Sequence, residues 1–233
     1  MPLVDVSIQD GVWLLSVDRP PANAIDLTLV QALHERLGEA ERSPDCSAVV
    51  LTGTGEAFSA GIDVKVVPTY DAATLADMIR SVNRMVERLY GLPKPTVAAI
   101  NGHALGGGLV VALACDARFA AAGSYRLGLT EVSAGIPFPA APMIVVRSEL
   151  DATSARLLTL SGAVFAPADP PARALIDRIV APECLLPEVV QHASGLARGI
   201  AYAAVKRQLR APALSEMRAM IERDADPLLS GWL

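Results

Sequence analysis

The sequence predicts an α/β fold. Short apolar runs rich in β-branched residues alternate with segments whose apolar residues recur at helical spacing, which is typical of this class. The 233 residues are 52% hydrophobic, enough to bury one large core, although the length alone would also permit two domains. We expect one domain, residues 1–233, with a core in 1–150 and a mainly helical C-terminal region in 151–233.

The first elements are a hairpin, a helix and a strand. Apolar and polar residues alternate from Val4 to Val17 around a turn at Asp10-Gly11, which predicts a β-hairpin. Asp26 is a plausible N-cap for an amphipathic helix that reaches Pro44. The apolar run from Ala48 to Thr52 then predicts a buried strand.

The middle of the chain repeats this alternation. A longer helix is expected from Asp71 to Leu89, a buried strand from Val97 to Ile100, and a helix entered through glycines from Gly106 to Cys115. Beyond residue 131 the pattern predicts helices at 141–150, 154–160, 187–197, 199–209 and 215–223.

Composition and charge exclude several classes of function. A net charge of -5 with no Lys/Arg-rich run leaves no basic surface for nucleic acid. The N-terminus has no basic segment followed by an apolar one, so we expect the protein to stay in the cytosol. The most apolar stretch, residues 97–115, is interrupted by Asn101, His103 and glycines, and no membrane span is predicted.

The cysteines predict neither a disulfide framework nor a metal site. Cys46, Cys115 and Cys184 are odd in number and widely spaced, without a C-x-x-C pair. The chain has only three histidines to join them as ligands. We therefore expect no metal and no separate cofactor.

Three segments carry candidate chemistry, and each also has an ordinary structural interpretation. Residues 57–65, AFSAGIDVK, form a turn of small residues after a strand that can expose backbone N–H groups, or simply a turn in which Asp63 acts as a cap. Residues 101–110, NGHALGGGLV, place three glycines at a helix start, where free amides and the helix dipole can stabilise a developing oxyanion. Close helix packing would equally explain the glycines, and His103 is more simply a hydrogen-bonded core residue than a catalyst.

The third segment, residues 125–139, contains one carboxylate among mainly apolar neighbours. Glu131 is a candidate base whose pKa burial would tune, although taken alone it could equally be an exposed residue at a helix start.

Taken together, these motifs resemble the enoyl-CoA hydratase/isomerase (crotonase) family from about residue 4 to about residue 210. The family's A-F-S-A-G-x-D motif matches residues 57–63, its N-G-x-x-x-G-G-G motif matches 101–108, and its C-D-x-x-x-A element matches 115–120. Arg19-Pro20 with Asn23-Ala24 looks like the family's early R-P-x-x-x-N-A loop.

The resemblance implies a crotonase-like ββα spiral with a C-terminal helical trimerisation region. It also implies a homotrimer or homohexamer and coenzyme A thioester substrates. The oxyanion-hole amides would be those of Ile62 and Gly107, and Glu131 would be the base. By matching positions, the substrate would contact Ala22, Ala24, Ala60, Ile62, Asp63, Val64, Lys65, Gly107, Val110, Pro137 and Phe138.

One departure bears on the reaction. Enoyl-CoA hydratases of the family carry a first catalytic Glu two residues after the glycine triplet, where this chain has Val110. Hydration divides its proton transfers between two carboxylates, whereas moving a double bond from C3 to C2 needs one base. The residues therefore favour an enoyl-CoA isomerase. A specialised hydratase and a coenzyme A thioester-binding paralogue without turnover are the alternatives.

Overall fold

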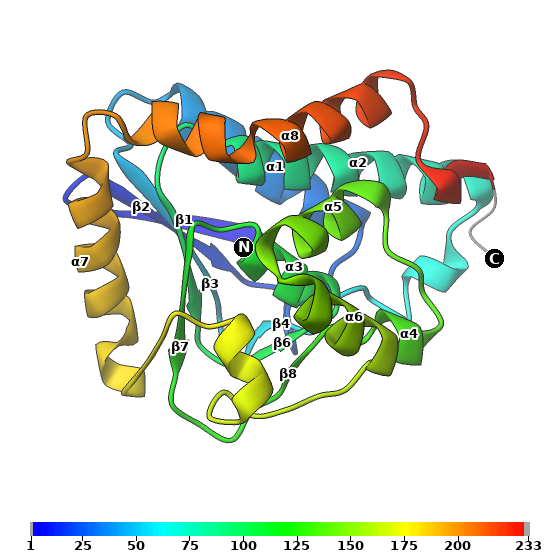
Figure 1. Cartoon of the computed structure of the whole chain (residues 1–233), viewed down its shortest axis with the longest axis horizontal. Coiled ribbons are helices and arrows are strands. Elements are labelled where there is room, and N and C mark those ends of the chain that lie inside the picture. Colours follow the sequence, from blue (N-terminus) through cyan, green and yellow to red (C-terminus); the bar gives the residue numbers. More distant parts are fainter. Residues whose placement is uncertain (1, 231–233) are drawn as a thin grey trace.

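The computed structural model describes residues 2–230, in which the strands form two sheets (Figure 1). The larger sheet has the order β1-β2-β3-β5-β7-β9. These strands are β1 (Val4–Gln9), β2 (Val12–Val17), β3 (Ala48–Gly53), β5 (Thr96–Ile100), β7 (Ala117–Ala121) and β9 (Arg178–Val180). All neighbours are parallel except β1 and β2. β5 and β7 are buried along their whole length, as expected of parallel strands covered on both faces.

The hairpin, the first helices and the central strands confirm the sequence predictions. The β1–β2 turn has positive φ at both Asp10 (49°) and Gly11 (79°), the conformation that a two-residue hairpin requires. Helix α1 (Leu27–Arg42) begins after Asp26, whose carboxylate accepts from the N–H of Leu29. Helix α2 (Ala72–Gly91) is capped by Asp71 in the same manner.

The smaller sheet joins three parallel strands, β4 (Ala57–Ser59), β6 (His103–Leu105) and β8 (Leu127–Gly128). None of the three was predicted, because a strand of two or three residues is too short to show an alternating pattern. β7 and β9 were also missed. β9 brings a strand into the region that the sequence predicts as mainly helical, so residues 178–180 complete the edge of the core sheet.

The remaining helices surround the sheets. They are α3 (Gly107–Leu113), α4 (Glu131–Ala134), α5 (Ala140–Glu149), α6 (Ala152–Ser161), α7 (Leu185–Ala197) and α8 (Tyr202–Glu222). Single 3-10 turns lie at Val67–Thr69, Pro170–Ala174, Pro182–Cys184 and Pro227–Ser230. α7 contacts β3, β5 and β7, while α8 crosses the molecule against α2 and α5 (Figure 1).

Helix α8 corrects the prediction of two separate helices at 199–209 and 215–223. It runs unbroken from Tyr202 to Glu222 with Pro212 inside it. An internal proline removes one backbone hydrogen bond and costs about 3 kcal/mol. Tertiary contacts offset this cost. Leu214 and Met217, in the helical turns after Pro212, are buried, and Arg210, before it, donates to the carbonyl oxygens of Tyr90 and Ala114.

The C-terminal helices also pack on this chain more than the sequence suggests. The sequence from Leu185 to Trp232 has too much apolar surface for a lone tail, which predicts that other subunits cover it. Part of it is buried within the chain, whereas Ile200, Val205 and Leu209 are exposed; Trp232 lies outside the described residues. Within residues 2–230, no helix combines the length and apolarity needed to span a bilayer.

Candidate active site

The small sheet aligns the three segments that the sequence singled out. Parallel strands end at the same edge of a sheet, and each of β4, β6 and β8 is followed within three residues by a candidate site residue. Ile62 follows β4, Gly107 follows β6, and Glu131 follows β8. This arrangement brings residues from three distant parts of the chain to one pocket.

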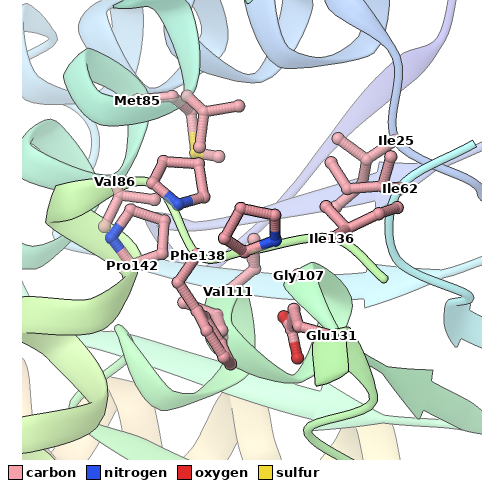
Figure 2. A pocket seen from close by; sticks show the side chains of 14 residues that line it. Ile25, Ile62, Met85, Val86, Gly107, Val111, Glu131, Ile136, Phe138 and Pro142 are labelled. Carbon is pink, nitrogen blue, oxygen red and sulfur yellow. The ribbon is translucent and has the colours of Figure 1, made fainter. Parts of the chain in front are cut away.

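That pocket has a cavity volume of about 30 Å³. Its lining is apolar apart from Glu131, and it comprises Ile25, Ile62, Val82, Met85, Val86, Gly107, Val110, Val111, Glu131, Ile136, Pro137, Phe138, Pro139 and Pro142. Figure 2 shows Ile25 and Ile62 on one side of the pocket, Met85 and Val86 on another, and the Glu131 carboxylate projecting from a third.

Gly61 fixes the position of the Ile62 amide. Gly61 has φ +78°, and a Cβ at this position would lie only 2.5 Å from the carbonyl oxygen of Leu105 and 3.3 Å from the nitrogen of Gly107. Only glycine allows this approach between the loop after β4 and the start of α3. The Ile62 and Gly107 amides therefore lie on two backbone segments that are in close contact.

Both amides are free to bind a ligand. Gly107 is the first residue of α3, where an N–H has no acceptor within the helix. Neither the Gly107 nor the Ile62 N–H donates to an acceptor within the described residues. Two unpaired donors beside an apolar pocket are an arrangement that can stabilise a developing oxyanion.

Glu131 is the first residue of α4, but it is not exposed as a helix-start residue usually is. It is 7% exposed, and its Oε2 has no hydrogen-bond partner among residues 2–230. Burial raises the pKa of Glu131 to about 7. An unpaired carboxyl group with this pKa can accept and return a proton near neutral pH.

The glycine triplet and Glu131 also meet directly. Gly106, the N-cap of α3, has φ +49°, and a Cβ there would lie 3.4 Å from Oε1 of Glu131. The carboxyl group therefore rests against the backbone that presents the Gly107 N–H. Val110, 1% exposed one helical turn later, lines the same pocket with an aliphatic side chain.

A second, more open groove of about 470 Å³ adjoins this pocket. The two share Glu131, Ile136, Pro137 and Phe138, so Pro137 and Phe138 border the cavity beside the carboxylate, and their contacts with a substrate stay predictions.

The remaining predicted binding residues form a separate region outside the pocket lining. The Ala60 N–H donates to the carbonyl oxygen of Ala22, and Arg19 donates to the carbonyl oxygen of Ala24, both at the surface-facing loop before α1. Val64 and Lys65 are exposed. Their contacts with a substrate stay predictions.

Asp63 has partners within the protein. Its carboxylate accepts from Arg19 at 2.8 Å and from the N–H groups of Lys65 and Val66. Burial opposes ionisation, but these hydrogen bonds outweigh it and lower the pKa of Asp63 below its ordinary value. Arg19 also pairs with Asp26 at 2.9 Å, so it ties the Ile62 loop to the start of α1.

Two further observations complete the site. His103 lies outside the pocket lining, and its Nδ1 accepts from the N–H of Arg126 at 3.2 Å, which supports the structural interpretation. Sequence reasoning missed Ile25 and the α2 residues Val82, Met85 and Val86. The apolar face of α2 was readable, but nothing local indicates that it faces a ligand pocket rather than the core.

A sequence model described as enoyl-CoA hydratase/isomerase matches residues 7–230. The chain belongs to this family. A probable enoyl-CoA hydratase of Mycobacterium avium is 35% identical over 179 residues, which cover 77% of this chain and 69% of the relative.

Solved structures of the family share the fold. A probable enoyl-CoA hydratase of Mycobacterium tuberculosis has a TM-score of 0.86 at 31% identity, with 96% of this chain and 94% of that one covered. The human mitochondrial delta3-delta2-enoyl-CoA isomerase has a TM-score of 0.88 at 27% identity, with 95% and 88% covered. These relatives establish the crotonase fold and support membership of the enoyl-CoA hydratase/isomerase family, and their names include both reactions.

Proposed function

We propose that this family member isomerises 3-enoyl-CoA thioesters to 2-enoyl-CoA thioesters with Glu131 as the single base. The observation that supports this reaction is the composition of the pocket. Among the described residues that line it, Glu131 alone has an ionisable side chain, and Val110 occupies the position where hydratases of the family carry a second carboxylate.

The proposed reaction is a two-step proton shift. The Ile62 and Gly107 N–H groups bind the thioester oxygen, and the Glu131 carboxylate removes a proton from C2, so that the electron pair passes into the enolate. The neutral Glu131 then returns the proton to C4 as the double bond forms between C2 and C3. Loss of either amide contact would remove roughly 3 kcal/mol of transition-state stabilisation.

The coenzyme A portion is proposed to lie outside the apolar pocket. Ala22, Ala24, Ala60 and the residues from 62 to 65 occupy adjoining loops, and Ile62 belongs to both regions. Two backbone hydrogen bonds hold these loops together: the Ile25 N–H donates to the carbonyl oxygen of Gly61, and the Asp63 N–H donates to that of Ile25. A thioester bound there could place its carbonyl group beside the free amides.

Hydration is the second candidate, because the sequence relatives named above are described as probable hydratases. A coenzyme A thioester-binding protein without turnover is the third. Purified protein is assayed with 3-enoyl-CoA and 2-enoyl-CoA thioesters. Formation of the 2-enoyl chromophore supports isomerase, its loss supports hydratase, and affinity without either reaction supports a binding protein.

Glu131→Gln tests the base. This variant should lose nearly all turnover and keep its thioester affinity within a few-fold, because binding rests on backbone and apolar contacts. Undiminished turnover would exclude Glu131 as the base.

We also propose a homotrimer or homohexamer, since exposed apolar side chains remain on the chain after it folds. Ile200, Val205 and Leu209 lie at or near α8 and are 106%, 56% and 79% exposed.

A further inference from the structure

A buried polar pair connects two walls of the active-site pocket. Asn83, on α2, is 2% exposed, and Asp226, in the segment after α8, is 4% exposed. The Asn83 side-chain N–H donates to the Asp226 carboxylate at 2.7 Å. The two residues are far apart in sequence and outside every motif that identified the family.

This pair caps helix α5. The residue before α5 is Pro139, whose side chain cannot accept a hydrogen bond from the first helical amides. Asp226 accepts from the Ala140 N–H at 2.8 Å, and Asn83 accepts from the Ala141 N–H at 2.9 Å. Two orphan donors of α5 are therefore satisfied by residues from other elements, and the negative charge of Asp226 lies at the helix end that favours it.

The capped helix end is part of the pocket wall. Phe138 and Pro139 immediately precede α5, and Pro142 lies in its first turn; all three line the pocket. Asn83 lies between Val82 and Met85, which line the pocket from α2, and α2 packs against α5. The Asn83–Asp226 pair therefore links α2 to the end of α5 that lines the pocket.

We propose that Asp226 is a positioning residue that, with Asn83, sets the separation of α2 and α5 and so determines which acyl groups the pocket accepts. This inference rests on the proposed function, in which the acyl group of a thioester occupies the pocket. Asp226 acts through Asn83 and the α5 amides and touches no reacting atom. A long acyl group fills the space between α2 and α5, whereas a short one ends near Glu131 and is insensitive to that separation.

The test compares substrates of two lengths. Asp226→Ala should raise KM for 3-decenoyl-CoA about tenfold, equivalent to about 1.4 kcal/mol, and KM for 3-hexenoyl-CoA less than about threefold, since it removes the hydrogen bonds to Asn83 and the Ala140 N–H. kcat for 3-hexenoyl-CoA and the apparent pKa of the pH–rate profile should stay unchanged. Asp226→Asn, which keeps one acceptor oxygen for the α5 amide, should restore most of the preference.

Asp224→Asn is the matched control. Asp224 lies two residues away in the same segment, is exposed, and pairs with Arg80 at 2.7 Å without contacting α5. The control should leave both KM values unchanged. Equal losses on both substrates, or the same length-dependent effect in the control, would overturn the proposal. If the alanine variant does not fold, Asn83→Ala, which removes the same polar pair and the cap of the Ala141 N–H, takes its place and should show the same length-dependent loss.

A binding measurement separates this proposal from the proposed reaction. Calorimetric titration of hexanoyl-CoA and decanoyl-CoA needs no turnover. A selective loss of decanoyl-CoA affinity in Asp226→Ala, in a protein that converts no enoyl thioester, would support the positioning residue and refute the isomerase. Isomerase activity with an unchanged affinity ratio would refute the positioning residue alone.

Discussion

Glu131 and Val110 line the same pocket, one as a buried carboxyl group and the other as a buried aliphatic side chain. Their difference in chemistry is the basis for preferring isomerisation. Glu131 could be predicted from its motif, yet its burial could not, because the backbone against which it rests comes from Gly106, the N-cap of α3, which follows another strand of the small sheet. A local sequence window at Glu131 indicates only the start of a helix.

The pKa of Glu131 predicts how activity depends on pH. The base must be ionised to remove a proton, so kcat/KM should rise with pH and level off above an apparent pKa of about 7. A pH–rate profile measures this value. A profile that is flat between pH 5 and pH 9 would contradict the assignment.

The same shift predicts a change in stability. The folded-state pKa of Glu131 is raised from 4.5 to about 7 by burial, so the folded protein holds this proton more tightly than the unfolded chain does. This proton stabilises the folded protein by on the order of 3 kcal/mol below pH 4.5, and that stabilisation is lost as pH rises through about 7. Denaturant unfolding should show that the unfolding free energy of wild type falls relative to that of Glu131→Gln as pH rises from 4.5 to above 7.

Val110→Glu tests the other side of the pocket. A carboxylate there would face the pocket that also contains Glu131 and could hold a water molecule, so the ratio of hydration to isomerisation should rise modestly. Burial of the new group should raise its pKa and cost several kcal/mol of stability. An unchanged ratio in a folded, thioester-binding variant would remove the main support for an isomerase.

At the scale of elements, the small sheet of β4, β6 and β8 assembles the site, although each of its strands is only two or three residues long. Their motifs were readable from the sequence, but their pairing was not. Helix boundaries set by local capping, such as Asp26 and Asp71, were predicted well. Helix α8 was predicted as two helices because the contacts that stabilise the turn around Pro212 come from distant residues such as Tyr90.

Arg19 holds two elements together at the edge of the site. Arg19→Met would leave the Asp26 and Asp63 carboxylates, 10% and 13% exposed, without their cation, so we expect a loss of about 2–3 kcal/mol in unfolding free energy and a higher KM. Arg36→Met, which breaks the more exposed pair with Glu39, is the control and should cost less than about 1 kcal/mol. Equal losses in the two variants would show that Arg19 has no special importance.

At the scale of the whole molecule, the exposed apolar residues of α8 predict association between copies. Light scattering at micromolar concentration should show a trimer or hexamer. Leu209→Lys should weaken it, while Gln208→Lys, which adds the same charge at an exposed neighbouring position without removing an apolar side chain, should not. A monomeric wild type would contradict this expectation.

The order of the strands bears on how the protein is made. Along the larger sheet each strand lies next to one that precedes it in the chain, from β1 to β9, and the smaller sheet follows the same rule. Both sheets can therefore grow in step with synthesis, since each new strand meets a finished edge. Helix α8 and Asp226 must instead return to α2, about 140 residues earlier in the chain. A nascent chain that has passed residue 180 holds all the strands, the Ile62 and Gly107 amides and Glu131, but α5 still lacks its cap from Asp226. With the role proposed for Asp226, the width of the pocket is the last property of the active site to be fixed during translation.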